Sequence, residues 1–226
     1  MLKSSLRNFA ISLLLSSVCW QSLTAQAPYF AGAVGGIATI SADGQSSLGS
    51  AAAVSSYKPE NGPAFNGFAG MHLWEYVSLQ GNYVWNRNSF RMTSVLAGDS
   101  AAVFYEQLRR SSQHGAFADL LLYFRNRQSR IRPYLSVGGG VVRFSSMAEM
   151  LTASGGTPLL PPIEFVSTEP ALRVAVGIDL AISQGWSFRY TFSESIRGNP
   201  ISTRLAPPGD RNLANFQNLF GFVKSF

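Results

Sequence analysis

The sequence ends in Phe216-Gln-Asn-Leu-Phe-Gly-Phe-Val-Lys-Ser-Phe226, and the alternation of apolar with small or polar residues in this segment predicts a β-strand. Successive side chains of a strand point to opposite sides, so one face carries four phenylalanines: Phe216, Phe220, Phe222 and Phe226. Such a face is rare on the last strand of a soluble protein but typical of a barrel whose outer wall contacts lipid. Lys224 interrupts it, and we expect this residue near a headgroup region, where its ammonium reaches water.

The N-terminal segment indicates export from the cytoplasm. Lys3 and Arg7 precede a short apolar run over 9–18, and small residues follow. These are the parts of a secretory signal peptide, and the run is too short for a membrane-spanning helix. We favour cleavage after Ala25 over a site two residues later. The predicted organisation is therefore a signal peptide over 1–25 and one barrel domain over 26–226.

Composition also favours β-structure. The chain carries 16 Phe, 8 Tyr, 4 Trp and 21 Gly, without long apolar runs after the signal peptide. This mixture suits strands with one apolar face and one small or polar face. The net charge of +6 includes two residues of the signal peptide, and the remainder is too small and dispersed to predict nucleic-acid binding. The only cysteine, Cys19, lies in the removed segment, so we expect no disulfide in the mature chain.

Period-two alternation predicts eight strands, each near the roughly nine to eleven residues that a tilted strand needs to cross a bilayer. They cover residues 29–40, 64–73, 77–86, 111–124, 132–145, 171–182, 186–195 and 213–226. Three connections are short, and four are long: 41–63, 87–110, 146–170 and 196–212. Short turns at one end and long loops at the other are typical of outer-membrane barrels.

Charged residues on the predicted strands indicate a filled lumen. The strand over 171–182 has an apolar face, and its other face carries Arg173 and Asp179. In a membrane barrel the apolar face contacts lipid, so these charges lie inside with Arg189 and Asp119 from other strands. Eight strands enclose an interior that side chains just fill, and buried charges need partners. We predict a paired network that plugs the lumen; the alternative is that the charges face separate waters and pair weakly.

The chain resembles the OmpA-like family of small, eight-stranded outer-membrane barrels. The resemblance rests on residues 132–141, on the hairpin over 177–190 and on the terminal Phe226. It implies an all-β fold, an eight-stranded antiparallel up-and-down transmembrane β-barrel in the bacterial cell outer membrane. It also implies recognition by the barrel-insertion machinery, with Phe226, Phe222 and Phe220 as the assembly signal. These motifs are architectural and imply no activity.

Two other motifs fit structural interpretations better than chemical ones. The glycine-rich segments 32–36 and 138–140 lack the following helix and the Lys-Ser/Thr of a phosphate loop, so we predict no cofactor or metal site. Ser112 and His114 share a strand face, with Glu106 or Asp119 as a nominal third partner for nucleophilic catalysis. Such a set arises easily by chance, and we predict that the protein is not an enzyme.

The predicted function is structural or surface-binding, with ligand contacts made by the external loops. The alternatives are a lipid A-modifying barrel enzyme, a narrow ion-conducting pore and a soluble secreted barrel. Arginines suggest a lipid partner: contact with anionic headgroup phosphates, including lipopolysaccharide, is the functional interpretation of two basic sets. One set is a run in a short turn, which is otherwise a solvated face: Arg125, Arg127, Arg130 and Arg132. The other lies near the external strand ends: Arg87, Arg91, Arg109, Arg110, Arg143, Arg197 and Arg211.

Deletion of Phe226 is expected to slow insertion into the outer membrane, because the main residue of the assembly signal is lost, and to leave periplasmic protein open to proteolysis. Pulse-labelling followed by protease treatment measures the inserted fraction. Ser225→Ala, which keeps the terminal phenylalanine, is the control and should insert at the normal rate. Unimpaired insertion of the truncated chain would contradict the assignment of the assembly signal.

Overall fold

The computed structural model describes residues 28–41, 44–48, 53–59, 61–97, 102–154, 163–200 and 212–226, and the predicted signal peptide lies outside these ranges. The described residues form ten strands in one sheet. The strands are β1 (Tyr29–Ser41), β2 (Gly44–Leu48), β3 (Ala53–Pro59), β4 (Asn61–His72), β5 (Val77–Ala97), β6 (Ala102–Tyr123), β7 (Ile131–Ser154), β8 (Glu164–Ser183), β9 (Trp186–Gly198) and β10 (Asn212–Ser225). No helix in the described part of the chain is long and apolar enough to span a membrane.

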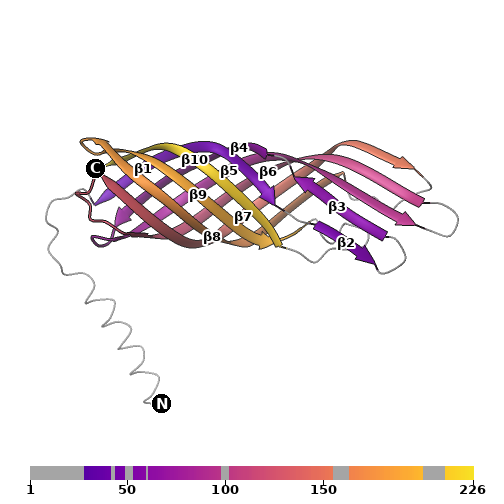
Figure 1. Ribbon diagram of the computed structural model, residues 1–226, viewed down its shortest axis with the longest axis horizontal. Coiled ribbons are helices and arrows are strands. Elements are labelled where there is room, and N and C mark those ends of the chain that lie inside the picture. The colour runs from indigo at the N-terminus through magenta and orange to yellow at the C-terminus, as the bar shows by residue number, and fades with distance from the viewer. Residues whose placement is uncertain are drawn as a thin grey trace, which may run out of the picture.

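Eight of these strands close into an antiparallel up-and-down barrel, as the sequence predicts. The ring runs β5-β4-β1-β10-β9-β8-β7-β6 and returns to β5. The N-terminal strand β1 and the C-terminal strand β10 pair along most of their length, from Phe30 opposite Ser225 to Ser41 opposite Ala214. Strands β2 and β3 add a hairpin to the far end of β5 (Figure 1). Closure pairs the backbone groups of every strand in the membrane zone, where no water is available to them.

The outer wall carries the apolar face that the sequence predicts. On β10, Phe220 and Phe222 are exposed, as is Phe226 directly after it, whereas Leu219 and Val223 point inward and are buried. The predicted alternation of β8 is also confirmed, because two adjacent residues in its centre differ in their exposed fraction. Val176 is 50% exposed and Ala175 only 5%. The barrel is therefore apolar on the outside, the reverse of a soluble fold.

Glycines let neighbouring strands of this narrow barrel, and the side chains they carry, approach closely. On β7, a Cβ at Gly140 would overlap the carbonyl oxygen of Ala116, and one at Gly138 would overlap the carboxylate of Asp119. Gly139, between them, points outward, and a Cβ there would meet nothing nearer than 3.9 Å. The two inward glycines thus serve packing rather than phosphate binding.

The lumen near the end away from the short turns contains a cluster of apolar side chains. Ile40, Phe90, Met92, Phe144 and Leu213 form a buried cluster contributed by β1, β5, β7 and β10. A second cluster lines the β1, β4 and β10 wall and includes Phe30, Val34, Phe68 and Leu219. Polar side chains occupy the space between and beside these clusters.

The predicted strand ends on one side of the barrel are wrong. The expected loops 87–110 and 146–170 are largely strand, because β5 continues to Ala97 and β7 continues to Ser154. The expected loop 41–63 contains β2 and β3. These segments are rich in serine and charge, which favours a loop in sequence, but lateral pairing in water stabilises them as sheet. Four neighbouring strands, β5 to β8, therefore extend far beyond the others (Figure 1).

Val176→Arg is expected to lower the free energy of unfolding by about 2–4 kcal/mol, the cost of an arginine facing lipid near the bilayer midplane. Val166→Arg is the matched control. Val166 lies on the same outer face of β8 and is 55% exposed, but ten residues nearer the external end. At a rise of about 3.3 Å per residue it lies outside the hydrocarbon layer and should tolerate the charge. Urea unfolding in lipid vesicles measures both, and equal losses would contradict the placement of the membrane.

Candidate functional site

The four charged residues predicted for the lumen all lie inside the barrel and are almost fully buried. Asp119 comes from β6, Arg173 and Asp179 from β8, and Arg189 from β9. They form two separate ion pairs, Arg189 with Asp179 and Arg173 with Asp119. The strand period places all four on inward-facing positions, and the register of neighbouring strands then decides which charges meet.

Arg189 is the most extensively bonded side chain in the lumen. Its Nε donates to Oδ1 of Asp179 at 2.6 Å, and its Nη2 donates to Oδ2 at 2.7 Å. Nη1 donates to Oε1 of Gln80 at 2.8 Å, and Nη2 also contacts the hydroxyl of Tyr123 at 3.0 Å. The Tyr123 hydroxyl donates in turn to Asp179 at 3.2 Å. Every nitrogen of the guanidinium therefore has an acceptor, as a buried charge requires.

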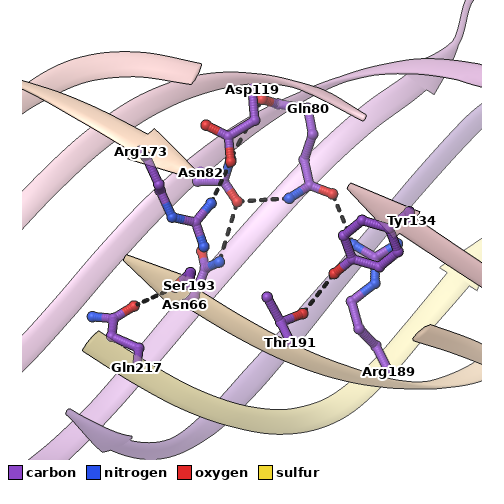
Figure 2. A network of polar contacts seen from close by, with 10 residues as sticks. All are labelled: Asn66, Gln80, Asn82, Asp119, Tyr134, Arg173, Arg189, Thr191, Ser193 and Gln217. Atoms are coloured by element: carbon purple, nitrogen blue, oxygen red, sulfur yellow. Dashed lines mark hydrogen bonds and ion pairs between the residues drawn. The ribbon is translucent and has the colours of Figure 1, made fainter. Parts of the chain in front are cut away.

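Aromatic rings enclose the same guanidinium. Its Cζ lies 4.7 Å from the ring centroid of Phe68 and 4.9 Å from that of Tyr134. The Tyr134 hydroxyl is bonded to Oγ1 of Thr191 at 2.6 Å (Figure 2). The cation is thus held between π-faces as well as by its carboxylate, which fits the geometry of a planar guanidinium.

The side-chain amides of Gln80 and Asn82 lie between Arg189 and the pair of Arg173 with Asp119 (Figure 2). Gln80 accepts from Arg189, and its Nε2 donates to Oδ1 of Asn82 at 2.7 Å. Asn66 on the adjacent β4 donates to the same oxygen at 3.1 Å. Asn66, Asn82, Tyr123 and Thr191 were not predicted as members of the lumen network. The sequence pattern could have identified them as lumen residues, because each occupies an inward-facing position in the period-two alternation of its strand.

A further set of polar side chains lies in the lumen nearer the external end. Asn215 on β10 donates to Oδ1 of Asn86 on β5 at 3.0 Å, and Asn86 donates to Asn88 at 2.6 Å. Arg109 donates to Gln107 at 2.6 Å and to Ser146 at 2.9 Å. Of these bonds, the one from Asn215 to Asn86 crosses the barrel, from β10 to β5.

Ser112 and His114 meet, but on the outer wall. Oγ of Ser112 lies 3.1 Å from Nε2 of His114, and Nδ1 of the ring is bonded to the Tyr83 hydroxyl at 2.8 Å. Neither suggested acid completes a catalytic set. Asp119 points into the lumen and pairs with Arg173, while Glu106 pairs with Arg91 at 3.0 Å. Tyr83 thus occupies the ring nitrogen that an orienting carboxylate would hold.

The basic set near the external strand ends divides between the two faces of the wall. Arg87, Arg91, Arg110 and Arg143 are exposed on the outside. Arg109 and Arg197 are buried inside, so the expectation that they face headgroup phosphates is wrong. Arg197 lies over the ring of Phe144 at 4.7 Å. Arg211 lies outside the described residues.

Comparison with known proteins gives one family and several structural likenesses. The family described as outer membrane protein beta-barrel domain matches residues 10–218. The structure of Neisserial surface protein A has a TM-score of 0.52 and 16% identity, covering 88% of this chain and 97% of that one. Ail, the attachment invasion locus protein of Yersinia pestis, has a TM-score of 0.43 and 9% identity, covering 89% and 100%.

The N-terminal β-barrel domain of Pseudomonas aeruginosa OprF has a TM-score of 0.34 and 13% identity, covering 85% of this chain and 98% of that one. At 16% identity, the likeness to Neisserial surface protein A shows the fold alone. A search of curated proteins found no match to the sequence.

Arg189→Leu is expected to lower the free energy of unfolding by about 3–5 kcal/mol, because it leaves the buried Asp179 carboxylate without its cation. Arg91→Leu is the matched control: it breaks the ion pair with Glu106, whose side chains are 53% and 37% exposed, and should cost about 0–1 kcal/mol. The double variant Asp179→Leu/Arg189→Leu should recover part of the loss, since no lone charge remains. Urea unfolding measures all three, and equal costs for the two single variants would contradict a stabilising pair.

Proposed function

Since this chain belongs to the outer membrane protein beta-barrel domain family and is an eight-stranded barrel of the bacterial outer membrane, we propose that it is a plugged scaffold that binds ligands at the cell surface. It acts neither as a diffusion pore nor as an enzyme. The proposal rests chiefly on one observation, the contrast between a lumen crossed by bonded side chains and a sheet that extends beyond the barrel.

The lumen contacts support the plug. Arg189 reaches from β9 to Gln80 on β5, and Asn215 reaches from β10 to Asn86 on the same strand. Both bonds cross the interior, at different heights, and the cluster around Met92 and Phe144 lies near the external end. An eight-stranded barrel has room for little besides its own side chains. Hydrated ions would have to displace these contacts, which opposes a diffusion pore.

The external extension supports a binding role. Strands β5 to β8 have 20 to 24 residues, whereas β1, β4, β9 and β10 have 12 to 14. A tilted strand crosses the bilayer with about nine to eleven residues, so the surplus stands outside the membrane together with β2 and β3 (Figure 1). Binding residues commonly lie on loops that a rigid scaffold positions.

One margin of this extension is formed by the part of β8 that lies beyond its pairing with β9. Residues 164–170 of β8 pair with β7, but pairing with β9 begins only at Ala171. This margin and the loops beside it are the surface on which we place ligand binding.

The outer wall supports lipid contact as a second part of the role. A groove of about 420 Å³ near the external end is lined by Trp85, Arg87, Arg110 and Ser112, among others. Arg110 is already paired with Glu149 at 2.6 Å, but Arg87 and Arg143 are exposed with no carboxylate partner among the described ion pairs. Guanidinium groups at this height suit the phosphates of an anionic outer-leaflet lipid such as lipopolysaccharide. The exposed Phe220, Phe222 and Phe226 likewise remain available to the barrel-insertion machinery.

Removal of residues 155–162 is expected to leave heat-modifiable gel mobility and unfolding stability nearly unchanged, because the lumen contacts lie elsewhere, but to alter adhesion of expressing cells to host-matrix surfaces. Intact protein in planar bilayers should show no steady single-channel conductance. Adhesion is measured with cells carrying equal surface amounts of each chain. A steady conductance, the same with and without residues 155–162, would favour the pore instead.

A further inference from the structure

The barrel has a polar cavity at its periplasmic mouth, the end opposite the external sheet. Its volume is about 230 Å³, and its lining includes His72, Arg127, Arg132, Ser183 and Ser187. Arg127 belongs to the turn between β6 and β7, and Arg132 to the start of β7. The cavity thus lies where two short turns come together, that turn and the turn between β8 and β9, which supplies Gly185.

Both arginines are held in place while part of each guanidinium lacks an acceptor. The backbone N–H of Arg127 donates to Oε1 of Glu75 at 2.8 Å, and its Nη2 contacts the carbonyl of Trp74 at 3.4 Å. The Cζ of Arg132 lies 3.9 Å from the ring centroid of Tyr123. Nevertheless Nε of Arg127, and Nε and Nη2 of Arg132, are buried and have no hydrogen-bond partner among the residues that the structure describes. Buried donors in folded proteins are normally satisfied by an acceptor, which can be a protein group, an ordered water or a bound anion.

The protein does not neutralise these charges from within the cavity. Asp179 is the carboxylate on the lining, and both of its oxygens are bound by Arg189, one of them also by Tyr123. No ion pair joins Arg127 or Arg132 to a carboxylate in the described part of the chain. The cavity therefore holds two guanidinium cations beside one carboxylate, that of Asp179, which is already paired with Arg189.

We propose that this cavity is a binding site for a phosphate group presented from the periplasmic side. Two guanidinium groups match the charge of a phosphate dianion and can bind it through paired N–H donors. The hydroxyls of Ser183 and Ser187 on the lining supply further donors. Since one water occupies roughly 30 Å³ of liquid, the cavity has room for one phosphate and a few bridging waters. The site is independent of the ligand surface on the external sheet.

The test is a calorimetric titration of the refolded barrel, residues 26–226, with inorganic phosphate in an uncharged detergent at constant ionic strength. The expected result is saturable binding of one phosphate per chain. Arg127→Gln and Arg132→Gln should each weaken it at least tenfold. Arg125→Gln is the matched control, because it removes the same charge from an exposed position of the same turn. It should leave the affinity unchanged.

Two further arms identify the source of the phosphate. Competition by soluble glycerol phosphate would identify a free phosphate ester, whereas a response only in nanodiscs that contain phosphatidylglycerol would identify a lipid headgroup; either supports the site. Absence of saturable binding in every arm would overturn the proposal. So would an equal loss with Arg125→Gln, which would show attraction by general surface charge. Arg127 lies outside the strands, so its variant stays informative if Arg132→Gln does not fold.

Discussion

The hydrogen bonding of the backbone in hydrocarbon is the constraint on which the rest of this structure depends. No water is available there, so each strand must be paired on both sides, and the sheet must close on itself. The seam between β1 and β10 meets this requirement, with twelve residues of β1 in register against β10. Closure with eight strands then fixes a narrow interior. The inward glycines and the dense side-chain contacts of the lumen follow from that width.

The interior combines buried ion pairs with clusters of apolar side chains. Arg189 and Asp179 lie on adjacent strands and directly opposite in register, which lets a planar guanidinium meet a carboxylate with two bonds. Gly177, two residues earlier on β8, leaves room for the ring of Tyr134 beside this pair. The apolar surface that a soluble protein would bury here is instead turned outward toward lipid. The alternation that would place apolar side chains inside a soluble β-protein thus places them on the outside of this barrel.

The sequence predicts the barrel well because one pattern, strict alternation, controls both faces. It places Val176 outside and Arg173 inside without any tertiary information. It fails at the external strand ends, because pairing beyond the membrane depends on neighbours that alternation does not name. Alternation also could not show which carboxylate pairs with Arg173. Asp119 lies on β6, and its ion pair with Arg173 on β8 spans the intervening β7. Alternation does, however, show that His114 and Asp119 cannot act together. One has an even and the other an odd number on the same strand, so their side chains lie on opposite faces of the sheet.

The bond from Arg189 to Gln80 joins residues 109 positions apart in the chain. Such a contact cannot form while the sheet is open, because β5 and β9 meet only across the completed interior. Until then, the cation and its carboxylate face water or the folding machinery. The network therefore forms late in assembly. Its formation is expected to be slow, because its contacts join residues far apart in the sequence. A nascent barrel that has not yet closed carries a thermodynamic penalty against entering hydrocarbon with its lumen face exposed.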